Sequence, residues 1–157
     1  MEQIEQIVKK KAPLILSSRF PANNPEAGEP THFREKIESG QKKHTIRQNS
    51  GWWRAKAEKI NSGEMALHLR SWSGKPYDSK QVEWGVYDKI GVQSVLIKYS
   101  SKEGYISVLV DGVYVSPDKL AHNDGLTMEQ FINWFFPYAD EDQEFEGIII
   151  HFTNLRY

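Results

Sequence analysis

The stretch FREKIESGQKKHTIR, residues 33–47, combines a helix signal with a strand signal and places a dense group of cations between them. Phe33 and Ile37 are four residues apart, so one face of a short helix would be apolar. Gly40 follows, and glycine ends helices readily because it adopts the left-handed conformation without steric cost. Residues 44–47 then favour an extended segment. The sequence therefore predicts a short helix that continues, through a basic segment, into a strand.

Three cations in this stretch, Lys42, Lys43 and Arg47, are candidates for contact with an anion or a polar planar ligand. Arg47 follows an apolar residue on the expected strand and offers a rigid planar fork for a phosphate or a carboxylate. The alternative is that these side chains form a solvated basic edge with no ligand. The density of cations at a junction between helix and strand favours the binding site.

Thr45 is the hydroxyl residue among these cations, and it could act as a nucleophile if a desolvated lysine served as its base. The alternative is an ordinary strand residue. On a regular strand Lys42 and Thr45 would point to opposite faces, whereas Lys43 and Thr45 would share one. Lys42 can approach Thr45 only if the chain bends near Lys43, and the sequence leaves open which lysine faces the cleft.

The composition is that of an ordinary globular domain, with 157 residues of which 39% are hydrophobic and 26% charged. This length predicts one domain over residues 1–157. The lack of cysteine excludes disulfides, thiolate catalysis and cysteine-ligated zinc, and it is compatible with a cytoplasmic location. We expect no membrane partner, because no apolar run is long enough to span a bilayer and the first eleven residues lack the apolar core of a signal peptide.

Charge is distributed unevenly along the chain, although the net charge is only −1. Residues 1–80 contain 15 Lys and Arg against 9 Asp and Glu, a balance of +6. Residues 81–157 contain 5 against 12, a balance of −7. A phosphate-bearing partner such as RNA would bind the basic half, and the alternative is that the two halves pair with each other.

Short strands and short helices alternate through the rest of the chain. An Asp-Gly pair between the two apolar runs of residues 105–115 predicts a β-hairpin. Thr127 and Gln130 have the spacing of a capping box and predict the start of a helix. The expected strands are residues 14–16, 44–47, 65–72, 92–99, 105–110, 113–115 and 147–152, and the expected helices are 1–12, 33–39, 52–59, 117–121 and 127–136. This pattern predicts an α+β fold built on a small β-barrel of five to seven strands, with short helices in the connections and at the N-terminus.

The remaining candidates are scattered along the sequence. None of the five histidines has the spacing of a metal site, so we expect no metal and no cofactor. His44 lies within the basic stretch and is a candidate ligand contact. Asp124 lies between loop residues and could be an ordinary turn aspartate or a functional acid. Trp53 belongs to a set of tryptophans that could stack on bases, the alternative being a place in the core.

The pattern Gly40-x-Lys42-x-x-x-x-Arg47, preceded by a short helix, resembles the GxKxxExR signature of ASCH domains, which belong to the PUA-like superfamily of β-barrels. Lys42 falls on the lysine of that motif, Arg47 on its arginine and Thr45 on its glutamate. The same threonine occurs in the ASCH subgroup that hydrolyses N4-acetylcytidine, whose proposed catalytic set is a lysine, a threonine and a glutamate. In the segment AHNDGLT before a helix, Asp124 takes the place of that glutamate with a side chain one methylene shorter.

The resemblance implies a PUA-like barrel over residues 14–157 that binds RNA or a nucleoside-like small molecule in a polar cationic cleft. The ligand contacts expected in addition to Lys42 and Thr45 are Lys43, His44, Arg47 and Trp53.

The alternative implied by the resemblance is an amidohydrolase that removes an acyl group from a modified nucleoside such as N4-acetylcytidine. Thr45 would attack the amide carbonyl, Lys42 would activate it or stabilise the oxyanion, and Asp124 would carry the proton to the leaving amine.

Overall fold

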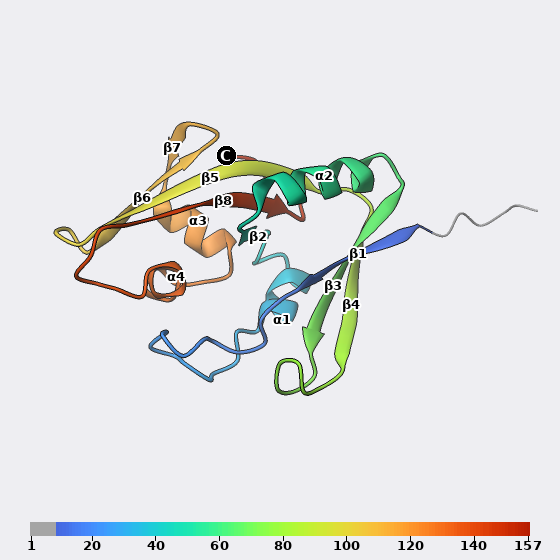
Figure 1. Ribbon diagram of the computed structural model, residues 1–157, viewed down its shortest axis with the longest axis horizontal. Helices are drawn as coiled ribbons and strands as arrows, with labels where there is room; N and C mark the ends of the chain where they lie inside the picture. The colour runs from blue at the N-terminus through green and yellow to red at the C-terminus, as the bar shows by residue number, and fades with distance from the viewer. Residues whose placement is uncertain (1–8) are drawn as a thin grey trace, which may run out of the picture.

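The computed structural model describes residues 9–157, which form an α+β fold with four helices and eight strands (Figure 1). The strands are β1 (Lys10–Ile15), β2 (His44–Arg47), β3 (Met65–Trp72), β4 (Gln81–Tyr87), β5 (Gly91–Ser100), β6 (Tyr105–Val110), β7 (Val113–Val115) and β8 (Gln143–His151). The helices are α1 (Phe33–Glu38), α2 (Ser50–Asn61), α3 (Pro117–Asn123) and α4 (Met128–Phe135).

The larger sheet is antiparallel throughout, with the strand order β2-β8-β5-β6-β7. Its most buried strand is β8, in which Ile148, Ile149 and Ile150 have no exposed surface. On one side β8 pairs with β5, and on the other with β2, where Thr45 lies opposite Ile150. The short strand β2 is therefore fixed to the centre of the core, and its side chains are held in place by that pairing.

The closed barrel of five to seven strands that the sequence predicts is not formed by the described residues. The smaller sheet has the order β1-β3-β4, with β1 parallel to β3, and no ladder joins it to the larger sheet. Closing the two sheets into a barrel would need ladders at both pairs of free edges, for example β1 with β2 and β4 with β7, and the described residues form neither. Between β1 and β2, Nη2 of Arg47 donates to the carbonyl of Ile15 (2.8 Å).

The helix predicted over residues 1–12 is wrong where the structure describes it, because residues 10–12 begin β1 and pair with the start of β3. Residues 1–8 of that predicted helix lie outside the described residues. Ala12 and Leu14 are buried while their neighbours are more exposed, which is the alternation of a strand. Its partner lies far along the chain, so the local sequence did not reveal this pairing.

Several elements with a local signal in the sequence follow the prediction. Phe33 and Ile37 are buried on α1, and Gly40 follows this helix with a φ of 84°. Thr127 and Gln130 form the predicted capping box at the start of α4. The predicted hairpin of β6 and β7 is also confirmed. These elements were predictable because each depends on residues only a few positions apart.

Two further elements, β4 and α3, differ from the prediction. β4 was not predicted, although Val82, Trp84 and Val86 alternate with their neighbours as the apolar residues of a strand do. α3 extends to Asn123, two residues beyond its predicted end at residue 121. The buried face of α2 packs against β3 and β5. Among residues 9–157, no helix combines the length and the apolar character needed to cross a lipid bilayer.

The close approach of β2 to β8 depends on Gly147, since a Cβ at this position would overlap the carbonyl oxygen of Arg47. We expect Gly147→Ala to lower the free energy of unfolding by about 1–3 kcal/mol, because β2 must move away from β8. Gly51→Ala is the matched control: Gly51 lies in α2, and an added Cβ there meets nothing within 4 Å. Urea unfolding of both variants checks this, and a Gly147→Ala protein as stable as the unmodified chain would contradict the tight packing.

Candidate functional site

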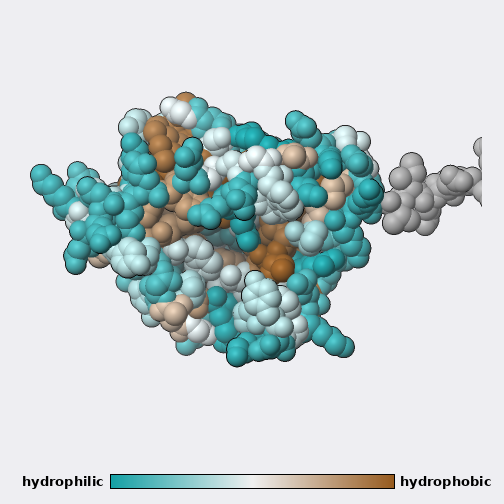
Figure 2. Space-filling model, in the orientation of Figure 1, coloured by the Kyte–Doolittle hydropathy of each residue, from teal (hydrophilic) through white to brown (hydrophobic). Residues whose placement is uncertain are grey.

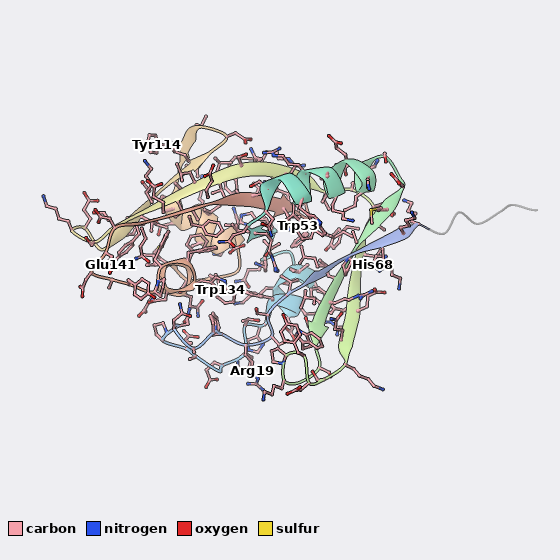
Figure 3. The ribbon with its side chains drawn as sticks, in the orientation of Figure 1. Arg19, Trp53, His68, Tyr114, Trp134 and Glu141 are labelled. Atoms are coloured by element: carbon pink, nitrogen blue, oxygen red, sulfur yellow. The ribbon has the colours of Figure 1, made fainter. Side chains whose placement is uncertain are left out.

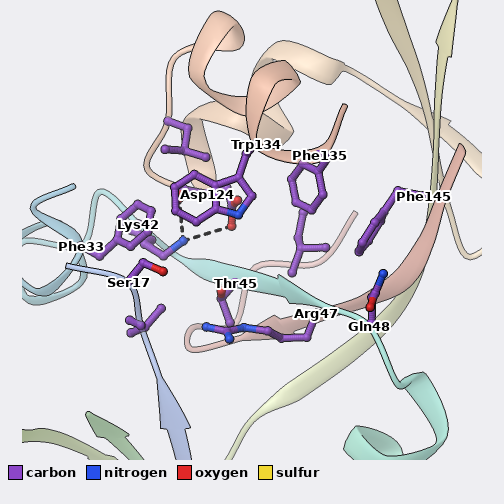
Figure 4. A pocket seen from close by; sticks show the side chains of 13 residues that line it. Ser17, Phe33, Lys42, Thr45, Arg47, Gln48, Asp124, Trp134, Phe135 and Phe145 are labelled. Atoms are coloured by element: carbon purple, nitrogen blue, oxygen red, sulfur yellow. Dashed lines mark hydrogen bonds and ion pairs between the residues drawn. The ribbon is translucent and has the colours of Figure 1, made fainter. Parts of the chain in front are cut away.

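A cavity of about 380 Å³ lies between β2, the segment after β1 and helix α4 (Figure 4). In the space-filling view, the middle of this face is hollowed and brown apolar side chains are visible inside it (Figure 2). Its lining combines aromatic walls with a cluster of polar and charged groups. The lining residues are Leu16, Ser17, Phe33, Lys42, Thr45, Ile46, Arg47, Gln48, Asp124, Leu126, Trp134, Phe135 and Phe145.

Lys42 is the most buried cation of the cavity, with a side chain that is 1% exposed. Its Nζ donates to the backbone carbonyl of Asp124 (2.6 Å) and to Oδ1 of the same residue (3.1 Å). The ammonium also lies 4.3 Å from the centre of the Phe33 ring. Burial lowers the pKa of Lys42, and the Asp124 carboxylate opposes that shift. An ammonium has three N–H donors, so the two bonds to Asp124 leave one for a ligand.

A bend between α1 and β2 directs Lys42, and not Lys43, into the cavity. The backbone amide of Lys42 donates to the carbonyl of Lys36, and that of Lys43 donates to the carbonyl of Asn123. The carbonyl of Lys43 still accepts from the amide of Phe152, next to the β2–β8 ladder, so the bend lies at Lys42 and Lys43, just before β2. Nζ of Lys43 folds back to a backbone carbonyl just after α1 (2.7 Å). The bend that Lys42 and Thr45 need in order to share a cavity is therefore present.

Asp124 lies at the end of α3, with a side chain that is 6% exposed. Its Oδ1 accepts from Lys42 and from Nδ1 of His44 (3.2 Å). Its Oδ2 makes no hydrogen bond to any group of residues 9–157. Gly125 follows with a φ of 80°, and a Cβ there would lie 3.1 Å from Cβ of Lys42. Glycine is thus needed both for the turn after Asp124 and for the space that Lys42 occupies.

Thr45 is 5% exposed and lines the same cavity as Lys42 and Asp124. Within the described part of the chain, its hydroxyl makes no hydrogen bond. The hydroxyl oxygen is not among the fully buried polar atoms that lack a partner, so it is accessible from the cavity. The Thr45 hydroxyl is therefore available to a molecule in the cavity.

Arg47 and the aromatic side chains define the rest of the site. Figure 4 shows the guanidinium of Arg47 next to Thr45, on the side of the cavity formed by β2. Burial lowers the pKa of Arg47, but guanidinium stays protonated in proteins, so it contributes a positive charge. Opposite it, the ring centres of Phe33 and Trp134 are 5.7 Å apart, and those of Phe135 and Phe145 are 4.7 Å apart. This lining suits a flat ligand with polar edges.

Three residues predicted as ligand contacts do not line this cavity: Lys43, His44 and Trp53. Lys43 turns toward α1, as described above. His44 lies behind Asp124, where burial lowers the pKa of its ring and the hydrogen bond to Asp124 opposes that shift. Trp53 is buried on the inner face of α2, whereas Trp134 projects from the end of α4 (Figure 3). His44 can therefore act on a ligand only through Asp124.

Several residues of the site had no functional signal in the sequence. Trp134 and Phe135 lie near the end of α4, where they are half-buried and line the cavity. Ser17 lies in the irregular segment after β1. Tyr157 reaches His44 from the last position of the sequence, with Oη 2.6 Å from Nε2. No local pattern connects these positions, because the fold alone brings them together.

The identity of the site has to be inferred from its own residues. Comparison of the chain with protein-family profiles, with curated proteins and with solved structures gave no match. In the part of the chain that the structure describes, no three His, Asp or Glu side chains gather in a way that could hold a metal ion.

His151 lies opposite His44 in the β2–β8 ladder, with ring centres 5.5 Å apart. Burial, with a smaller contribution from His44, lowers the pKa of His151 from 6.5 to about 3. The unfolded chain therefore binds this proton first as the pH falls, so stability is complete above pH 6.5 and decreases toward pH 3. The slope for one such group is at most about 1.4 kcal/mol per pH unit.

Urea unfolding across this pH range measures the effect. His151→Gln should make the free energy of unfolding less dependent on pH. The side-chain amide of the new glutamine can donate to Gln93 in place of Nε2, but it does not titrate. His122→Gln, at an exposed position of α3, should leave the dependence unchanged. Equal pH slopes for His151→Gln and the unmodified chain would contradict the prediction.

Proposed function

We propose that the cavity binds a nucleoside-like ligand, either free or as a single base of an RNA strand, on a PUA-like fold of the ASCH type. The observation that carries the proposal is that Lys42, Thr45 and Asp124, from separate segments, line one cavity with aromatic walls. The ASCH-like spacing from Gly40 to Arg47 falls where α1 passes into β2, which supports the same assignment. The two sheets would then be an open variant of the barrel, with the ligand between β1 and β2.

The chemistry of the lining fits a base better than it fits a simple anion. Rings on two sides of the cavity offer faces for stacking, which contributes about 1–3 kcal/mol per base. The Thr45 hydroxyl, the Gln48 amide and the free oxygen of Asp124 can bond the polar edge of a base. Arg47 can bond a carbonyl or a phosphate oxygen. The negative charge of Asp124 disfavours a ligand that is only an anion.

A second function, hydrolysis of an N-acyl group on the base, is favoured by the unpaired hydroxyl of Thr45 next to Lys42. Thr45 Oγ1 would form a bond to the acyl carbon, and the bond from that carbon to the exocyclic nitrogen would break. Lys42 would stabilise the oxyanion with its third N–H, and Asp124 would pass the hydroxyl proton to the leaving amine. Water would then cleave the threonine ester, releasing the carboxylic acid and restoring the hydroxyl.

Incubation with N4-acetylcytidine tests both functions. We expect the protein to bind this nucleoside in calorimetry and to release cytidine, detected by chromatography. Thr45→Val keeps the shape of the side chain but removes the nucleophile, so it should still bind while turnover falls by at least about 10³-fold. Ser107→Ala, which removes an exposed hydroxyl on β6 outside the cavity, is the control and should keep full turnover.

The outcomes separate the two functions. Binding without turnover would exclude the hydrolase and leave the binding function. Equal turnover by Thr45→Val and the unmodified protein would exclude Thr45 as the nucleophile. No binding of N4-acetylcytidine, cytidine or an acetylated oligoribonucleotide would contradict the proposed function as a whole.

A further inference from the structure

A chain of hydrogen bonds leads from Asp124 away from the cavity to Tyr157. Nδ1 of His44 lies 3.2 Å from Oδ1 of Asp124, and Nε2 of the same ring lies 2.6 Å from Oη of Tyr157. The side-chain amide of Asn123 donates to the same phenol oxygen (3.1 Å). None of Asn123, His44 or Tyr157 lines the cavity, so this chain supports the site from behind.

The chemistry of the groups gives the chain one direction. A carboxylate can only accept, so Nδ1 of His44 must carry the hydrogen that points at Asp124. In a neutral imidazole the other nitrogen is then an acceptor, so Tyr157 must donate to Nε2. Burial raises the pKa of Tyr157 to about 12, although the bond from Asn123 opposes that shift, so the phenol keeps its hydrogen at neutral pH.

Tyr157 is held in position by a clamp on its own backbone. Its amide donates to Oε1 of Gln93 (3.0 Å), and Nε2 of Gln93 donates to its carbonyl (3.1 Å). These two bonds place the ring independently of its hydroxyl. Removing the hydroxyl alone should therefore leave the ring in place and break only the link to His44.

The two oxygens of Asp124 differ in their hydrogen bonds. Oδ1 receives both His44 and Lys42, whereas Oδ2 has no partner among the described residues. Without the Tyr157 hydroxyl, Nε2 of His44 would be a buried acceptor with no donor, although Asp124 would still require the hydrogen on Nδ1. The ring could then turn or bind a second proton, and its Nδ1 would no longer hold Oδ1 in this orientation.

We infer that Tyr157 is a positioning residue of the site: through the ring of His44, it fixes which oxygen of Asp124 holds Lys42 and which is free for the ligand. Its effect on catalysis rests on the proposed function, but its effect on the His44 ring does not. The groups that face the His44 ring are Asp124, Lys42, His151 and Tyr157.

The state of the His44 ring is read directly by NMR of the protein labelled with ¹⁵N at histidine. The unmodified chain should show a neutral ring with its hydrogen on Nδ1 and a hydrogen-bonded Nε2, and Tyr157→Phe should show a weakened Nδ1–H bond to Asp124 or a doubly protonated ring. Tyr114→Phe, which removes an exposed hydroxyl on β7, should leave the signals unchanged. A hydrogen on Nε2 in the unmodified chain, or an unchanged Nδ1 signal in Tyr157→Phe, would overturn the inference.

Kinetics on N4-acetylcytidine give the second readout. Tyr157→Phe should lower kcat by about tenfold and change KM by less than about twofold, since the loss of one hydrogen bond in the support affects orientation and not ligand contact. His44→Asn, whose amide can replace the Nδ1 donor, should keep more activity than His44→Leu. Equal kcat for Tyr157→Phe and the unmodified protein would overturn the positioning role. If the unmodified protein has no turnover, the hydrolase function fails while the NMR result still decides the inference.

Discussion

The contact between the Lys42 ammonium and the Asp124 carboxylate, whose side chains are 1% and 6% exposed, is the constraint on which the rest of the site depends. Removing two charges from water is costly, and it is tolerated only when geometry and additional hydrogen bonds compensate. Here Lys42 also bonds the Asp124 carbonyl, and His44 adds a second donor to the carboxylate. The pair ties the end of α3 to the segment before β2, two regions that share no strand ladder.

The surrounding fold supplies the room and the rigidity that this contact needs. Gly125 leaves the space through which Lys42 passes, and the pairing of β2 with β8 fixes Thr45 next to it. The two sheets remain apart between β1 and β2, and Arg47 crosses that gap. At this point a side chain, and not a strand ladder, connects the two sheets, and the same arginine lines the cavity.

The sequence predicted the local parts of this arrangement and missed those that depend on distant contacts. The helix ending before Gly40, the hairpin of β6 and β7 and the capping box of Thr127 rest on near neighbours, and all three are present. The first residues of β1 were mistaken for the end of a helix, because their pairing with β3 cannot be read from residues 10–15 alone, whereas the predicted strand over residues 14–16 overlaps the end of β1.

The candidate site follows the same division. Lys42, Thr45 and Arg47 could be proposed from one short motif, but the choice of Lys42 over Lys43 depends on a backbone bond from Lys43 to Asn123, far along the chain. Tyr157 has no local signal at all, since its role depends on the position of its ring against His44. Spacing in the sequence therefore identified which residue types form the site, and tertiary contacts determined their orientation.

The most direct measurement is a double-mutant cycle between Lys42→Met and Asp124→Leu, followed by urea unfolding. Each single variant leaves one buried charge without its partner and should lower the free energy of unfolding by about 3–5 kcal/mol. The double variant replaces the pair by apolar groups and should lose much less than the two single losses together. Single losses that add to within about 0.5 kcal/mol would show that the two residues are not coupled, and would contradict the account.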